Sequence, residues 1–175
     1  QTLLVMVFVL GLHAEPRTVV KISTKSATAL VDTNDAPDLK EWGGNAGTVC
    51  VEWFPKIAAL LPSDGFVAPK EVTLYFDPKM KGVAHALGGK ITISAAFVRA
   101  HRDDFGMVVH ELTHVVQQRQ GRVANPYGSG LAVVHDPGLE EEAEQQGTLA
   151  AKHPGRGRSE GGHVQRRTVG KVDAE

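Results

Sequence analysis

The segment GMVVHELTHVVQQ, from Gly106 to Gln118, places two histidines four residues apart, with a glutamate directly after the first. On an α-helix, residues at positions i and i+4 lie one above the other, so the imidazoles of His110 and His114 can converge on one metal ion. The carboxylate of Glu111 then points toward a water molecule on that ion and can accept its proton. The pattern predicts a catalytic Zn²⁺ site with two ligands and a general base on one helix.

The residues around the motif favour this interpretation over a helix that happens to carry two histidines. At about 100° per residue, the motif shares one arc of the helix with Met107 and Gln117. The opposite arc is an apolar stripe, made by Val108, Leu112, Val115 and Val116. Asp103 or Asp104 is placed to cap the helix, and Gly121 to end it. We therefore expect a helix that packs against the core with its apolar stripe and carries the reactive side chains on the opposite arc.

A catalytic zinc ion of this kind needs a third protein ligand and an open position for water. The candidates all follow Gly121, and they are His135, Asp136, Glu140, Glu141, Glu142, Glu144, His153 and His163. A ligand on a second helix is better preorganised than one in a turn or a tail, which favours the acidic run after Gly138. Most carboxylates of that run are expected only to complement the positive end of the helix dipole. His135 stays an alternative.

The length and composition fit one globular domain of 175 residues, of which 42% are hydrophobic. A formal charge of -1 and a pI near 6.8 give no electrostatic reason to expect nucleic acid or an anionic membrane as partner. The apolar run QTLLVMVFVL, followed by LHA, predicts a signal peptide over residues 1–14, with a buried first strand as the alternative. We therefore expect a secreted protein, extracellular or periplasmic. The single cysteine, Cys50, is expected to be a buried, inert thiol.

The remaining patterns predict the class α+β, because strands come before the motif helix. Strands are expected at 17–23 and 71–77, and a hairpin over 82–94 around Gly88 and Gly89. Asp35 or Asp38 is expected to start a helical segment that Gly43, Gly44, Gly47 and Pro55 break into two pieces or kink. A short helix is expected at 94–101, and a further helix at 139–152. The domain would cover 15–152, and the Gly- and Arg-rich tail 153–175 would be disordered.

Four stretches together resemble the basic secretory protein family, a group of zincin-like secreted metallopeptidases of plants and bacteria. They are APDLKEW, WFPKIAALLPSDGFVAPKEVTLYFD, GVAHALGGKITISAAFV and GMVVHELTHVVQ, between about Val19 and Gln118. The resemblance implies a zincin-like fold, in which a small mixed sheet with a hairpin packs on the HExxH helix. It also implies that His110 and His114 bind the metal and that Glu111 is the general base.

The same resemblance aligns Glu140 with a later metal-binding glutamate of the family. Glu144 would then orient a ligating histidine. The chain departs from the family at Gln145, where the family has tyrosine, and in a longer gap between the two motifs. The helices that follow the acidic motif in the family are replaced here by the Gly- and Arg-rich tail.

We accordingly expect a secreted zinc peptidase acting on a peptide or protein substrate. The strand GKITIS could pair with an extended peptide by strand addition, and His85, Tyr127 or His135 could stabilise the oxyanion. The competing hypothesis is a non-catalytic, zinc-binding secreted or defence protein on the same scaffold. A purely structural zinc site fits less well, because such sites close with four protein ligands and favour cysteine.

Overall fold

Six strands form one mixed sheet in the order β4-β5-β3-β2-β1-β6. The structure is a computed structural model that describes residues 17–61, 70–123, 136–152 and 165–169. The strands are β1 (Val19–Ser23), β2 (Thr28–Asp32), β3 (Glu71–Asp77), β4 (Ala84–Leu87), β5 (Lys90–Ser94) and β6 (Gln165–Val169). β3 is parallel to both of its neighbours, β2 and β5, while the other pairs are antiparallel. The class is therefore α+β with a mixed sheet, as the sequence predicted.

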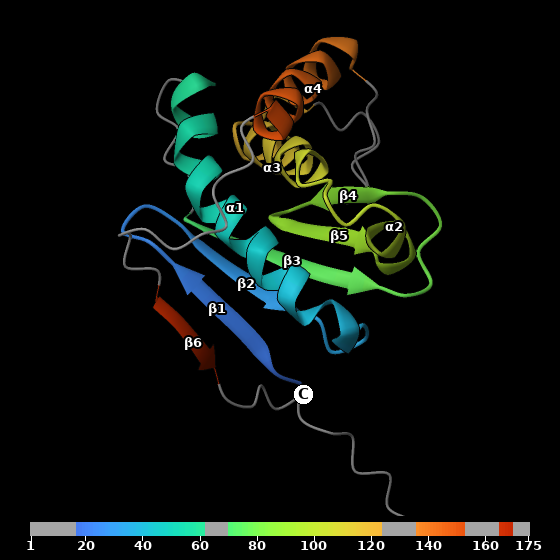
Figure 1. Cartoon of the computed structure of the whole chain (residues 1–175). Helices are drawn as coiled ribbons and strands as arrows, with labels where there is room; N and C mark the ends of the chain where they lie inside the picture. Colours follow the sequence, from blue (N-terminus) through green and yellow to red (C-terminus); the bar gives the residue numbers. More distant parts are fainter. Residues whose placement is uncertain (1–16, 62–69, 124–135, 153–164, 170–175) are drawn as a thin grey trace, which may run out of the picture.

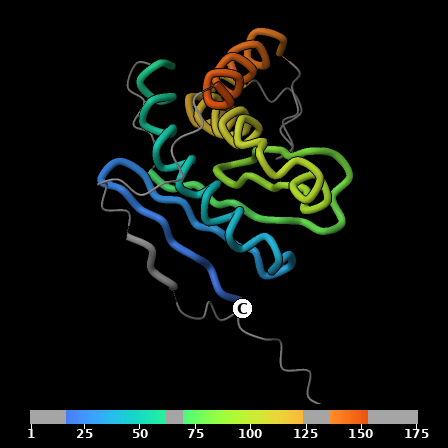
Figure 2. The backbone as a smooth tube through the Cα atoms, in the orientation of Figure 1, coloured from blue at the N-terminus to red at the C-terminus, as the bar shows by residue number. Residues whose placement is uncertain are grey.

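Helices cover one face of the sheet and stack at its β4 edge (Figures 1 and 2). They are η1 (Pro37–Leu39), α1 (Lys40–Leu60), α2 (Ala95–Ala100), α3 (Gly106–Arg119) and α4 (Pro137–Lys152). α1 connects β2 to β3 and crosses the sheet. α3 contacts α1 and the β4–β5 hairpin, and α4 packs on α3. Among the described residues, no helix combines the length and the apolar character that a membrane span requires.

The core lies between the sheet and the helices α1 and α3. Alternate residues of β3 and β5 point into it, among them Leu74, Phe76 and Ile91, each fully buried. α3 is buried on nearly all sides, because α4 covers the arc that the sequence assigned to chemistry: Gln117 is 0% exposed and Met107 9%. The motif helix is thus a central element rather than a half-exposed one.

α1 runs without a break for 21 residues, which corrects the expectation of two short helices or a broken one. Two of its glycines are needed for close packing: a Cβ on Gly47 would lie 2.6 Å from Cδ1 of Ile22, and one on Gly43 would lie 2.9 Å from Cγ2 of Thr33. Pro55 lies inside the helix, where burial of Phe54 beside it offsets the lost backbone hydrogen bond. Tertiary packing therefore outweighs the low helix propensity of these residues.

The helix caps follow the sequence only in part. Asp104 accepts a hydrogen bond from the backbone N–H of Met107 at 3.1 Å, as predicted for the start of α3. Asp35 and Asp38 do not cap a helix, which corrects that prediction. Asp38 instead pairs with Arg99 at 2.8 Å, and Asp35 accepts from Arg17 and from the hydroxyl of Tyr75.

The expected hairpin is confirmed as β4 and β5, joined by Gly88 and Gly89, whose φ angles of 58° and 95° favour glycine. The tail is a correction: residues 165–169, expected to be disordered, form β6 and pair with the free edge of β1. β2 was not predicted from the sequence. The predicted signal peptide, residues 1–14, lies outside the described residues.

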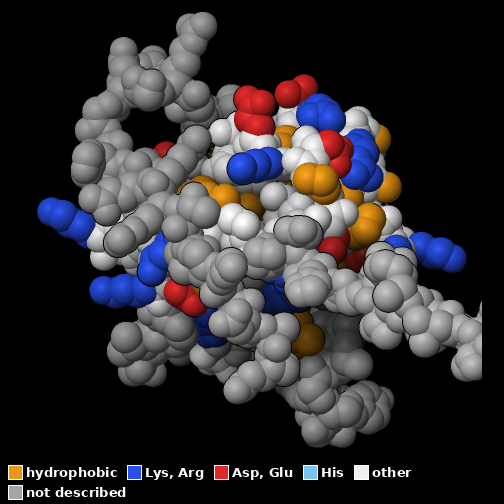
Figure 3. All heavy atoms as spheres, turned by 90° about the horizontal axis from the view of Figure 1, so that it is seen from below, with side chains coloured by type: hydrophobic (Ala, Val, Ile, Leu, Met, Phe, Trp, Pro, Cys, Tyr) orange, Lys and Arg blue, Asp and Glu red, His pale blue; other side chains and the backbone are white. Residues whose placement is uncertain are grey.

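Cys50 is fully buried, and burial raises the pKa of its thiol to about 12, as expected for an inert cysteine. On the described part of the face in Figure 3, hydrophobic side chains lie in small groups among basic and acidic ones. Large exposed hydrophobic residues are likewise spread over different elements, as in Leu60, Leu87 and Leu149. Scattered exposure of this kind is normal for a protein surface.

Two glycines of α1 allow a matched test of the packing between helix and sheet. Gly47→Ala should destabilise the protein by about 1–3 kcal/mol, because its Cβ would overlap Ile22 and Val31. Gly44→Ala, three residues earlier, should raise stability by about 0.5–1 kcal/mol, because nothing lies within 4 Å of the added Cβ. Urea unfolding measures both values. Equal effects of the two substitutions would contradict the close approach of α1 to β1 and β2.

Candidate metal centre

The two histidines of the motif face each other on α3. Their Nε2 atoms lie 3.1 Å apart, and the ring planes are nearly perpendicular, at 82°. Both side chains are largely buried, with 24% of His110 and 17% of His114 exposed. The i, i+4 spacing thus brings two ring nitrogens together at the edge of the core, as the sequence predicted.

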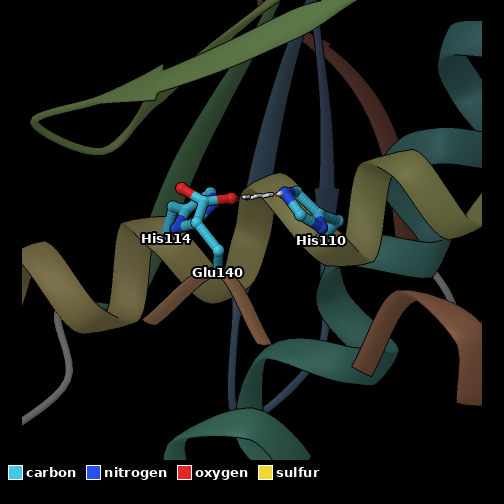
Figure 4. A group of neighbouring side chains, drawn as sticks. All are labelled: His110, His114 and Glu140. Atoms are coloured by element: carbon cyan, nitrogen blue, oxygen red, sulfur yellow. Dashed lines mark hydrogen bonds and ion pairs between the residues drawn. The ribbon is translucent and has the colours of Figure 1, made fainter. Parts of the chain in front are cut away.

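Glu140 on α4 completes the group. Its Oε2 lies 3.7 Å from Nε2 of His110 and 3.5 Å from Nε2 of His114. The carboxylate points toward the two imidazoles from the neighbouring helix (Figure 4). One ligand atom from each of these residues lies within 4.8 Å of the others, so the three side chains could hold a metal ion.

The close crossing of α3 and α4 places Glu140. A Cβ on Gly147 would lie 2.9 Å from the carbonyl oxygen of Gly106 and 3.3 Å from Cβ of His110, so only glycine fits this contact. Glu140 precedes Gly147 by two helical turns and therefore shares its face of α4. The two helices run antiparallel, since the end of α3 meets the start of α4 where Gln117 donates to the carbonyl of Leu139 at 2.9 Å.

Gln117 fixes the orientation and the tautomer of His114. Its Nε2 donates to the carbonyl of Leu139 and to Oε2 of Glu142, so its Oε1 serves as the acceptor for His114. That oxygen lies 2.9 Å from Nδ1 of His114, which must therefore carry the proton. Nε2 of His114 is left with a lone pair directed at the centre of the group. Gln117 was predicted to lie on the same arc of the helix as the histidines, but it was assigned no role. Its position three residues after His114 could have indicated a contact between the two side chains.

The charges around His110 favour the unprotonated ring that metal binding requires. Burial lowers the pKa of His110, as does the neighbouring His114, while Glu140 and Glu144 act in the opposite direction. Oε2 of Glu144 lies 3.7 Å from Nδ1 of His110. The structure therefore places Glu144 beside the histidine that it was expected to orient, at a separation longer than a direct hydrogen bond.

Glu111 is the one buried carboxylate of the motif, with 8% of the residue exposed. Burial, and to a smaller extent the nearby charge of Glu140, raises the pKa of Glu111 to about 7. Together with His110 it lines a pocket of about 350 Å³ between α3, α4 and the residue before β4. A carboxyl group with a pKa near neutrality beside a possible metal site is well suited to accept and return a proton.

The other acidic candidates of this region have different partners. Asp136 caps α4 by accepting from the N–H of Gly138 at 2.9 Å. Glu142 forms a two-point ion pair with Arg122, which holds the pKa of that carboxyl below its usual range. Glu141 accepts only a long hydrogen bond from Gln145 among the described residues. His135, His153, His163 and Tyr127 lie outside the described residues.

The expected peptide-binding strand requires a correction. GKITIS forms β5, which already has β4 and β3 on its two sides, so it cannot pair with a peptide. β4 is the edge strand, but part of its edge is occupied: the side chain of Gln118 donates to the carbonyl of Ala86 at 2.7 Å and accepts from the N–H of Gly88 at 3.1 Å. His85 is exposed on β4 and does not line the pocket.

Comparison of the chain with protein-family models, with curated proteins and with solved structures finds no match. The resemblance in the sequence therefore stays a prediction, and the functional argument depends on the geometry of the chain's own residues.

The contact between Gln117 and His114 predicts a loss of metal affinity in Gln117→Leu. The substitution replaces the amide by an apolar side chain of similar size, and it removes the acceptor for Nδ1 of His114, so zinc affinity should fall about 10- to 100-fold. Calorimetric titration of metal-free protein with zinc measures this. Gln145→Leu, at an exposed position of α4, is the control and should bind as the wild type does. Unchanged affinity in a folded Gln117→Leu protein would exclude the positioning role.

The raised pKa of Glu111 predicts how stability depends on pH in metal-free protein. The folded state keeps this carboxyl protonated up to about pH 7. The protonated carboxyl therefore contributes fully to the free energy of unfolding below pH 4.5, the pKa in the unfolded chain, and this contribution is lost as the pH rises through 7. Between pH 4 and pH 8, the free energy of unfolding of the wild type should fall by on the order of 3 kcal/mol relative to that of Glu111→Gln. Glu141→Gln, at an exposed site, should follow the wild type. Parallel stability profiles for wild type and Glu111→Gln would refute the burial of an ionisable group.

Proposed function

We propose that this protein is a secreted, zincin-like zinc peptidase. The observation that carries the proposal is the convergence of His110, His114 and Glu140, together with a pocket that His110 lines jointly with the buried carboxyl of Glu111. The resemblance to the basic secretory protein family supports the same function, and the apolar segment over residues 1–14 supports export.

The donor atoms fit a small tetrahedral cation. With metal–ligand distances of about 2.0–2.1 Å, the edge of a tetrahedron is about 3.3 Å. The three donor separations are 3.1, 3.5 and 3.7 Å, so a zinc ion requires shifts of only a few tenths of an ångström. Two imidazoles and one carboxylate are also the donor set of catalytic zinc sites, which keep a fourth position open, whereas structural sites usually contain cysteine.

Bound zinc would supply Lewis acidity, which lowers the pKa of a water molecule to about 7. Glu111 would take up a proton from a water molecule that attacks the peptide carbonyl, and would return this proton to the leaving amine. Gln117 holds the imidazole of His114 in place through the hydrogen bond with Nδ1, while Glu144 lies 3.7 Å from Nδ1 of His110.

One observation favours a second candidate, a non-catalytic zinc-binding or defence protein. Gln118 occupies the backbone groups of Ala86 and Gly88 at the edge of β4, which an extended peptide would otherwise use. Zinc binding at full occupancy without turnover on a broad peptide library would favour this candidate over a peptidase.

Glu111→Gln tests the assigned mechanism. The variant should bind about one zinc per chain but hydrolyse peptides at least 100-fold more slowly, since a general base contributes about 10²–10⁴. Metal content by mass spectrometry and hydrolysis of a mixed peptide library measure the two properties. Glu141→Gln, which changes an exposed carboxylate of α4, should retain both. Hydrolysis at wild-type rates in the zinc-loaded Glu111→Gln variant would refute the role of Glu111.

A further inference from the structure

The pocket beside His110 has a lining that indicates which ligand it takes. It measures about 350 Å³, enough for a long side chain together with adjoining backbone, and one of the proposed zinc ligands, His110, lines it. Three lining residues carry carboxylates: Asp104 just before α3, Glu111 on α3, and Glu144 on α4. Neither lysine nor arginine is present among the described residues that line it.

The buried member of the three marks the pocket as a ligand site. Glu111 is only 8% exposed, and no hydrogen bond to it is found among the described residues. Its oxygens are not among the fully enclosed side-chain atoms that lack a partner, so a molecule in the pocket can reach them and supply a hydrogen bond. Asp104 accepts with Oδ1 from the N–H of Met107 at the start of α3, which fixes its carboxylate in the lining of the pocket.

The rest of the lining is suited to an aliphatic stem. Val83, Met107 and Ala151 contribute apolar surface to the same pocket. Long basic side chains bury their methylene groups along apolar surface while their charged end meets carboxylates. An acidic side chain would instead meet the like charges of Asp104 and Glu144, and an aliphatic one would leave these carboxylates without a counter-charge.

We propose that this pocket binds a lysine or arginine side chain of the substrate, so that the protein prefers peptides with a basic residue next to the scissile bond. The inference deepens the proposed peptidase function and depends on it for the position of the scissile bond. The recognition of a cationic side chain depends only on Asp104, Glu144 and the apolar walls.

A binding experiment tests the pocket without requiring turnover. N-acetyl-lysine methylamide and N-acetyl-norleucine methylamide differ in the terminal ammonium group, and NMR titration of zinc-loaded wild type gives both dissociation constants. We expect the lysine compound to bind about fivefold tighter, the range of a partly exposed ion pair. Asp104→Asn should remove most of this difference while preserving the cap of α3, because asparagine also accepts from the N–H of Met107.

Asp103→Asn is the matched control, because it removes the same charge one residue away, at an exposed position that does not line the pocket. It should leave the preference for the lysine compound unchanged. Equal affinities of the wild type for the two compounds, or equal effects of the two variants, would overturn the proposal.

Cleavage of a peptide library separates this inference from the proposed function. Cleavage next to lysine and arginine supports both. Cleavage without a basic preference overturns the selectivity of the pocket but leaves the peptidase, whereas selective binding of the lysine compound without any cleavage supports the cationic pocket and overturns the peptidase.

Discussion

The candidate site depends on the contact between Gly106 and Gly147, where α3 and α4 cross without an intervening side chain. The carbonyl of Gly106 lies 2.9 Å from the position that a Cβ of Gly147 would take, so any larger residue would push the helices apart. This crossing sets the height and rotation of α4, and thereby places Glu140 opposite the histidine pair and Glu144 beside His110. The same two glycines line the pocket that the two helices enclose with Val83.

Burial gives the site its chemical character. α3 is enclosed by α1, the hairpin and α4, so its polar residues are held in an environment that weakly screens charge. Burial lowers the pKa of His110, which favours the neutral ring that a metal ion needs, and it raises that of Glu111, which suits this carboxyl to exchanging a proton near neutral pH. Gln117, fully buried, satisfies His114 and ties the end of α3 to the start of α4. Structural support and ligand orientation are therefore provided by one hydrogen-bond network.

The sequence predicted what is local and missed what depends on tertiary contacts. The histidine spacing, the Gly88–Gly89 turn and the Asp104 cap follow from short-range rules, and the structure has each of them. The continuity of α1 and the pairing of β6 with β1 are decided by packing and by a free strand edge, neither of which periodicity reveals. Glu140 was selected through the resemblance, whereas the helix crossing that brings it to the histidines could not be read from spacing alone.

The central claim is that His110, His114 and Glu140 form one tetrahedral zinc site with an open position. Anomalous diffraction at the zinc edge, on crystals grown with zinc, tests it most directly. We predict a single strong site about 2.0–2.2 Å from Nε2 of each histidine and from one carboxylate oxygen of Glu140, with no fourth protein ligand. A zinc ion that has His135 or Glu144 in place of Glu140, or that is closed by four protein ligands, would contradict the account.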